Sequence, residues 1–317
     1  MNQSWRRVLY LVGLGVGSLL FLYQLWNGYQ AVVQKALRVS APALLGVALG
    51  IVMVATGLQM IAWSRLMQAL GNHLSWRQVV RGYALSFLPR YIPGSIWGYL
   101  SRGEWLHRSH NVTYQVSNFG SILEVVGILS ASCLTVGIYY ASLSSGLSQL
   151  VLLIVTALIP FAIWRVLQWV ISGHLFRCLF AKVSAVGASF QVTFWNWIAV
   201  VMLYLILWLC YGGLIWLLVQ ALGIPLAGSV IQYSFIFSLA WVVGFVVVFV
   251  PAGLGIREVT LSSLLVANIG LLSYQGSAVA IASRLTISIA ELVWLLFGLI
   301  LSRLGNHNII LRADNSN

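Results

Sequence analysis

The apolar run of residues 242–272 reads VVGFVVVFVPAGLGIREVTLSSLLVANIGLL and is broken once, by the segment PAGLGIRE. Proline removes a backbone N–H and clashes with the preceding helical turn, so the break predicts two helices that meet at an irregular turn. Irregular backbone at membrane depth persists only where protein or a wet cavity satisfies its polar groups. The segment therefore predicts a polar site inside a helical membrane protein.

The composition extends this prediction to the whole chain. Of 317 residues, 61% are hydrophobic and only 7% are charged, whereas a soluble domain has about 45–50% apolar and about 25% charged residues. A water-soluble globule and an intrinsically disordered chain are both excluded. We expect an all-α, polytopic integral membrane protein, with residues 1–317 forming a single transmembrane domain.

The charge balance points to a membrane orientation. The chain has 17 Lys and Arg against 5 Asp and Glu, a net charge of +12. Cytoplasmic loops of membrane proteins collect Lys and Arg, and with the N-terminus inside, only Lys35 and Arg38 fall on the outer side. The prediction is an inner (cytoplasmic) membrane protein with both termini in the cytoplasm. No solvated basic domain is evident, so nucleic acid is not an expected partner.

Apolar runs of about 20 residues predict about eight spans, with one or two re-entrant or broken helices besides. The seventh run is short for a full crossing. Residues 76–100 are also apolar but contain Pro89, Pro93, Gly94 and Gly98, which favours a re-entrant hairpin entered from the cytoplasm; the alternative is an amphipathic helix on the membrane surface. The spans are expected at about 8–26, 41–64, 115–140, 148–169, 191–219, 229–250, 258–273 and 277–303.

The break at residues 251–258 has an earlier counterpart, the segment PGSIWG at residues 93–98, which Arg102 follows. Downstream of each break lies a Ser-Ile-x-Glu sequence, at residues 121–124 and 288–291. Interrupted segments at corresponding places of two halves indicate the substrate site of a transporter. The similarity of the two segments suggests half-repeats at 41–145 and 190–303.

Two glutamates lie inside predicted spans, Glu124 and Glu291. Charged groups at membrane depth are costly and usually face a cavity or a counter-ion. One interpretation is that both line a substrate or proton path, together with Ser288 and Arg284 one or two helical turns before Glu291. The other is a structural ion pair between Arg284 and Glu291.

The sequence after the second break favours an anion site. A helix N-terminus offers free N–H groups and a partial positive charge, and an arginine there adds a planar fork suited to phosphate. Arg257 would hold a lipid phosphate; alternatively, it marks the cytoplasmic side and Glu258 is only an N-terminal helix charge. The first break, with Arg90 nearby, allows the same interpretation. The candidate lipid-binding residues are Pro251, Gly253, Gly255, Arg257, Glu258, Arg284, Ser288, Glu291, Glu124, Pro93, Gly94 and Arg102.

Motifs for enzymatic chemistry are not found. The histidines are scattered without metal-ligand spacing, and no phosphate-binding loop of an ATPase or nucleophile elbow is present. The three cysteines are widely spaced, and we interpret them as small hydrophobic residues. We therefore expect no catalytic residue, no cofactor and no metal site.

The segment VFVPAGLGIREVTLSSLL resembles the signature of the lysylphosphatidylglycerol synthase transmembrane domain family, also described as flippase-like. That family typically shows Pro-Gly-Gly-Leu-Gly-Val-Arg-Glu here, from which Ala252 and Ile256 depart. The resemblance implies roughly eight spans and movement of lipids between leaflets: anionic phospholipids, polyprenyl-linked lipids or hopanoids. The soluble aminoacyl-transferase domain of the full-length synthase is not expected in this chain, nor is lysine transfer.

Two other functions stay open at this point. A membrane-embedded transferase with a polyprenyl-phosphate donor could use a cluster of Glu104, His107 and His110. A non-transporting scaffold would tolerate neutral replacements of Glu291 and Arg257. A homo-oligomer, or a complex with a lipid-modifying enzyme, is compatible with all three.

Overall fold

The computed structural model describes residues 38–91, 97–172, 192–225, 228–247 and 250–314, together with single positions between 19 and 30. These parts consist of helices joined by turns, with no strand among them, which confirms the all-α prediction. In chain order the elements are α2 (Pro42–Ala69), α3 (Trp76–Ala84), η1 (Leu88–Tyr91), α4 (Trp97–His110), α5 (Tyr114–Leu143), α6 (Gly146–Ser172), α9 (Phe194–Ala221), α10 (Val230–Val246), η2 (Pro251–Gly253), α11 (Ile256–Ile269) and α12 (Ser273–Asp314).

Five of the described helices are long and apolar enough to cross a membrane: α2, α5, α6, α9 and the Ser273–Leu301 part of α12. The protein is therefore an integral membrane protein, but the count of eight spans is not supported. The predicted first span, 8–26, lies almost entirely outside the described residues.

The predicted sixth and seventh spans are shorter than expected. They correspond to α10 and α11, of 17 and 14 residues, whose lengths are about 25 Å and about 21 Å at 1.5 Å per residue. The hydrocarbon core of a bilayer is about 30 Å thick. The PAGLGIRE break therefore divides one apolar region into two short helices instead of separating two full crossings.

The segment 76–100 is also divided, as the sequence predicts. It forms α3, the 3-10 turn η1 and the start of α4, while Pro93 and Gly94 lie outside the described residues. The order long helix, short helix, 3-10 turn, short helix, long helix thus occurs twice, from α2 to α5 and from α9 to α12. The duplication of sequence itself stays a prediction.

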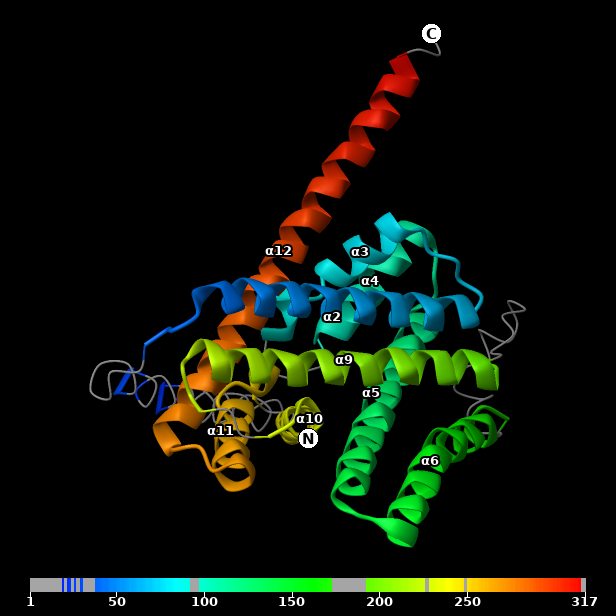
Figure 1. Ribbon diagram of the computed structural model, residues 1–317. Coiled ribbons are helices and arrows are strands. Elements are labelled where there is room, and N and C mark those ends of the chain that lie inside the picture. The colour runs from blue at the N-terminus through cyan, green and yellow to red at the C-terminus, as the bar shows by residue number, and fades with distance from the viewer. Residues whose placement is uncertain are drawn as a thin grey trace, which may run out of the picture.

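The two long helices that open these series lie side by side, as Figure 1 shows for α2 and α9. The start of α2 meets the end of α9, where the Ser40 N–H donates to the Ala221 carbonyl over 2.8 Å. The helices are therefore antiparallel, and α12 crosses both at an angle (Figure 1). Trp63 of α2 packs against Tyr83 of α3, and Trp208 of α9 packs against Trp241 of α10; both tryptophans are at most 1% exposed.

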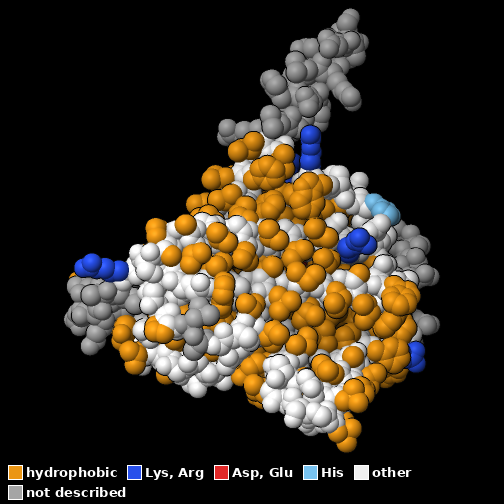
Figure 2. Space-filling model, in the orientation of Figure 1, with side chains coloured by type: hydrophobic (Ala, Val, Ile, Leu, Met, Phe, Trp, Pro, Cys, Tyr) orange, Lys and Arg blue, Asp and Glu red, His pale blue; other side chains and the backbone are white. Residues whose placement is uncertain are grey.

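Small residues allow neighbouring helices to approach closely, as is common in membranes. A Cβ atom at Gly212 of α9 would lie 2.6 Å from the Val230 carbonyl oxygen of α10, so this contact requires glycine. By contrast, α6 leaves many apolar side chains exposed, including Leu147 and Trp169. Hydrophobic side chains also cover much of the face seen in Figure 2. Such a surface is suited to lipid tails rather than to water.

Candidate functional site

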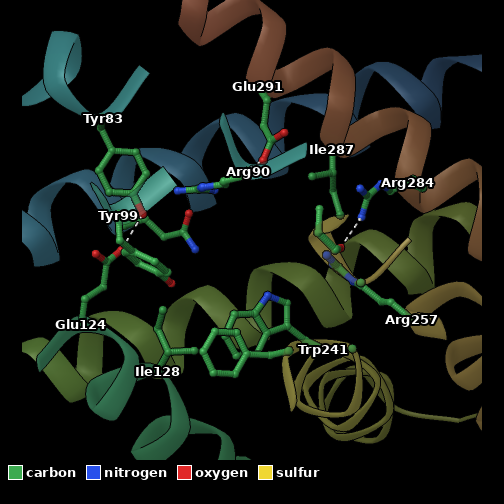
Figure 3. Close-up of a pocket in the computed structure, with 15 residues that line it drawn as sticks. Tyr83, Arg90, Tyr99, Glu124, Ile128, Trp241, Arg257, Arg284, Ile287 and Glu291 are labelled. Carbon is green, nitrogen blue, oxygen red and sulfur yellow. Dashed lines mark hydrogen bonds and ion pairs between the residues drawn. The ribbon is translucent and has the colours of Figure 1, made fainter. Parts of the chain in front are cut away.

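The two 3-10 turns contact each other, and a cavity of about 120 Å³ lies beside them (Figure 3). Elements from both series contribute its walls, so residues far apart in the sequence face one space. The charged lining consists of Arg90, Glu124, Arg257, Arg284 and Glu291; the other lining residues are Gln59, Tyr83, Tyr99, Ile128, Trp241, Gly244, Phe245, Ala252, Gly253 and Ile287.

The backbone of the second break explains its glycines. Gly253 and Gly255 have φ values of 65° and 80°, in the left-handed region that glycine enters without strain. A Cβ atom at Gly253 would also lie 3.0 Å from the Gly244 carbonyl oxygen of α10. The tight turn brings the first residues of α11, including Arg257, to the cavity wall.

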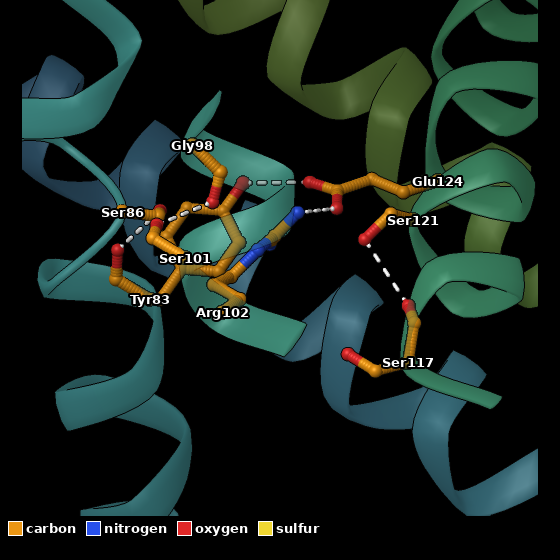
Figure 4. Close-up of polar contacts among 8 residues, drawn as sticks. All are labelled: Tyr83, Ser86, Gly98, Ser101, Arg102, Ser117, Ser121 and Glu124. Carbon is orange, nitrogen blue, oxygen red and sulfur yellow. Dashed lines mark hydrogen bonds and ion pairs between the residues drawn. The ribbon is translucent and has the colours of Figure 1, made fainter. Parts of the chain in front are cut away.

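The first ion pair of the site is buried and joins α4 to α5. Arg102 contacts the Glu124 carboxylate, and the Tyr83 hydroxyl donates to its other oxygen over 2.8 Å (Figure 4). Both charged side chains are 1% exposed. The Arg102 guanidinium also lies over the Trp63 ring, 5.1 Å from its centre. Both oxygens of Glu124 are therefore occupied by protein donors.

The second ion pair joins α11 to α12. Arg284, which Figure 3 shows at the cavity, donates to the Ala252 carbonyl over 3.4 Å. It also lies 3.5 Å from Glu258. The other Glu258 oxygen accepts from the Gly255 N–H over 2.6 Å, which caps the start of α11. Glu258 is thus both a helix cap and the counter-ion of Arg284.

A third ion pair connects the two series across the cavity. Arg90 of η1 lies 3.5 Å from Glu291 of α12, and the two side chains are 25% and 17% exposed. Among the described residues, Arg284 and Glu291 therefore have ion-pair partners other than each other. The anticipated Arg284–Glu291 pair is replaced by two pairs that involve different helices.

Arg257 differs from the other cavity arginines. It lines the cavity, is half-buried, and has no carboxylate within ion-pair distance among the described residues. Its guanidinium lies over the Phe237 ring, 4.6 Å from the ring centre. A cation over an aromatic face keeps the N–H groups in its plane available. Arg257 can therefore donate to an anion in the cavity.

A comparison with protein families decides the classification. The family model described as "Lysylphosphatidylglycerol synthase TM region" matches residues 10–295. The chain belongs to this family. The match includes both breaks and all three ion pairs, and it confirms the resemblance drawn from the PAGLGIRE segment. No curated protein and no solved structure matches the chain.

The sequence-based candidates of this lysylphosphatidylglycerol synthase TM-region protein fall into three groups. Glu124, Gly253, Arg257, Arg284 and Glu291 line the cavity. A second group, Arg102, Glu258 and Gly255, lies directly behind this lining and holds it through the contacts described above. Ser288 is half-buried on α12 and is not among the lining residues, the Pro251 side chain is not described, and Pro93 and Gly94 lie outside the described residues.

Several residues of the site were not candidates. Tyr83, Tyr99 and Trp241 all line the cavity, but aromatic residues are common in this chain and usually mark the membrane interface. Tyr83 reaches Glu124 only because α3 packs near α5, 41 positions away. The sequence carries no local signal for such a contact.

The cluster proposed for a transferase lies elsewhere. Glu104 pairs with Arg108 and accepts a hydrogen bond from Tyr114, while His107 contacts the Val112 carbonyl. The hydrogen bond from Tyr114, followed by that from Arg108, lowers the pKa of the exposed Glu104 carboxyl below its ordinary value. The contacts found at Glu104 are those of a surface network, and His107 is occupied with backbone.

Proposed function

We propose that this protein binds the anionic headgroup of a membrane lipid in the cavity beside η1 and η2 and moves it between leaflets. One observation carries the proposal: Arg257 faces the cavity without a carboxylate partner among the described residues. A half-buried charge at membrane depth is costly unless it is paired or hydrated. A phosphate oxygen offers the missing partner.

The position of Arg257 strengthens the proposal. It is the second residue of α11, where free backbone N–H groups and the helix dipole favour negative charge. Its planar guanidinium suits two oxygens of one phosphate. Headgroup binding would therefore use a side chain and a helix end together.

The wall opposite the charges suits the apolar part of a lipid. Trp241 and Phe245 stack with ring centres 5.1 Å apart, and Ile128 lies beside Trp241 in the cavity wall (Figure 3). Glycerol and the first acyl carbons would contact this wall, while the tails remain in the bilayer. This division follows the usual design of lipid sites, in which only the polar group needs protein partners.

The Arg90–Glu291 pair provides a means of movement. It joins η1 in the first series to α12 in the second and is more exposed than the other two pairs. A phosphate that reaches Arg90 competes with Glu291, so binding would loosen the connection between the two series. One series could then rock against the other around the site, driven by the lipid gradient or by protons. In this scheme both termini face the cytoplasm of an inner membrane.

The test is transport of labelled lipids in proteoliposomes. Arg257→Lys keeps the charge but loses the planar fork, and we expect at least about a tenfold slower rate, equivalent to about 1.4 kcal/mol of activation free energy. Arg108→Lys on the exposed side of α4 is the matched control and should transport at the wild-type rate. Unfolding temperatures of the variants exclude misfolding as the cause.

Two results would overturn the proposal. One is wild-type protein that moves none of the anionic phospholipids, polyprenyl-linked lipids or hopanoids tested. The other is an Arg257→Lys protein that transports as fast as the Arg108→Lys control.

A further inference from the structure

The charges around the cavity do not balance. Within the described residues, four arginines and three glutamates form this group: Arg90, Arg102, Arg257 and Arg284 with Glu124, Glu258 and Glu291. Each glutamate pairs with one arginine, and Arg257 remains. The site therefore carries one net positive charge when all these groups are ionised.

From this imbalance we infer that the preferred lipid carries one net negative charge, as a single phosphodiester whose other headgroup atoms are uncharged. The inference rests on the proposed function and narrows its substrate to one class. A charge removed from water is tolerated when it is paired, and an unmatched one is strongly unfavourable. One phosphodiester would pair with Arg257, so that every charge of the group has a partner of opposite sign.

A diphosphate headgroup fits this site less well. It brings at least one further negative charge, which would have to displace a glutamate from its arginine. Glu124 is held by both Arg102 and Tyr83, and Glu258 is held by Arg284 and the Gly255 N–H. Only the more exposed Arg90–Glu291 pair is open to competition.

A headgroup with an ammonium group would find no carboxylate in the cavity lining that is not already paired with an arginine. Glu124 and Glu291 are the carboxylates that line the cavity, and both are already paired with arginines. An uncharged headgroup, in turn, would leave Arg257 without an anion. The arrangement selects for the net charge of the lipid and not for hydrogen-bond capacity alone.

Competition between lipids in native mass spectrometry tests the inference. The purified protein is mixed with equal amounts of dioctanoyl phosphatidylglycerol, dioctanoylglycerol diphosphate and dioctanoyl phosphatidylcholine, which share their acyl chains and differ in charge. We expect at least about tenfold higher occupancy by phosphatidylglycerol, the ratio that a 1.4 kcal/mol difference gives. Arg257→Gln should reduce the ratio to about one.

A second variant makes the test independent of any loss of fold. Glu291→Gln keeps the shape of the side chain but frees Arg90, which raises the net charge of the site by one. Its preference should move toward the diphosphate lipid by about tenfold relative to wild type. Arg108→Gln, which removes an exposed arginine from α4, should keep the wild-type preference.

The outcomes separate the two proposals. Binding of all three lipids without preference, a wild-type preference for the diphosphate or zwitterionic lipid, or an unchanged preference in Glu291→Gln would overturn the charge inference while lipid binding stands. Absence of binding by every lipid would overturn the proposed function itself, and the inference with it.

Discussion

The α4–α5 region and the α11–α12 region have the same arrangement with opposite charges. In the first, the short helix carries Arg102 and the long helix Glu124; in the second, the short helix carries Glu258 and the long helix Arg284. Each pair ties a 14-residue helix to the long helix that follows it. The exchange of sign leaves the connection intact.

The two regions differ in how completely the pair is enclosed. Arg102 and Glu124 are both 1% exposed and in direct contact, and Tyr83 supplies a further donor. Arg284 and Glu258 lie 3.5 Å apart with 9% and 2% exposure, and the adjacent Arg257 faces the cavity. The first region thus holds a fully buried ion pair, whereas the second also has the positive charge of Arg257 beside the cavity. The comparison shows that one architecture can enclose both charges of a pair in one half and leave a positive charge beside the cavity in the other.

The largest effect should come from breaking the closed pair. Arg102→Met leaves the Glu124 carboxylate buried without a counter-ion, and removal of one partner from a buried pair costs about 3–5 kcal/mol. Arg284→Met should cost less, about 1–3 kcal/mol, because the Arg284–Glu258 pair is longer, at 3.5 Å, and Glu258 retains the Gly255 N–H. Denaturant unfolding of both variants in detergent measures the difference in unfolding free energy.

A double variant provides the control for this prediction. Arg102→Met with Glu124→Gln removes both charges while the glutamine oxygen still accepts from Tyr83. Replacement of a whole buried pair is often close to neutral, so most of the lost stability should return. Equal destabilisation by Arg102→Met and Arg284→Met would contradict the distinction between the two regions.

The sequence predicted the features of each region that depend on neighbouring residues. It did not predict the contacts between side chains that are far apart in the chain. Proline, glycine and charge in PAGLGIRE are enough to predict a broken helix with Arg257 at its end. The Arg90–Glu291 and Tyr83–Glu124 contacts depend on how helices pack, and no spacing along the chain encodes them. Hydropathy also cannot separate two crossings from two short helices joined by a turn, because both are apolar. Since either arrangement returns the chain to the same side, the predicted direction of α12 is the same for both.

A smaller effect is expected at the backbone, where each of the two series has one non-glycine residue with positive φ among its described residues. Asn111, between α4 and α5, has a φ of 54°, and Ala252 in η2 has a φ of 48°. Asparagine tolerates this region, but for alanine it costs about 1–2 kcal/mol. After the greater flexibility of glycine in the unfolded chain is subtracted, Ala252→Gly should stabilise the protein by about 0.5–1 kcal/mol.

Asn111→Gly is the matched control for that change. It should alter the unfolding free energy by less than about 0.5 kcal/mol, because asparagine already adopts left-handed backbone readily. Calorimetric or denaturant unfolding of the two variants under one condition gives the comparison. A larger gain from Asn111→Gly than from Ala252→Gly would show that backbone strain is not concentrated at η2.

The smallest effect concerns an exposed pair on the same helix as Arg102. Glu104 and Arg108 lie four residues apart on α4 and are 40% and 77% exposed, and surface pairs of this kind contribute little. The pKa of Glu104 is lowered in the folded protein by Tyr114 and Arg108. A carboxyl with a lowered folded pKa contributes stability above its unfolded pKa of about 4.3, and loses it as the pH falls through the folded pKa. The difference in unfolding temperature between wild type and Glu104→Gln should therefore be small and constant from neutral pH down to about 5, and then vanish at lower pH.

Glu104→Gln removes a solvent-exposed charge, whereas Arg102→Met leaves a buried charge without its partner. The loss of stability in Glu104→Gln should therefore be the smaller of the two at every pH where the protein folds. If Glu104→Gln instead destabilised the protein as much as Arg102→Met, the enclosure of the Arg102–Glu124 pair would not be the source of its strength.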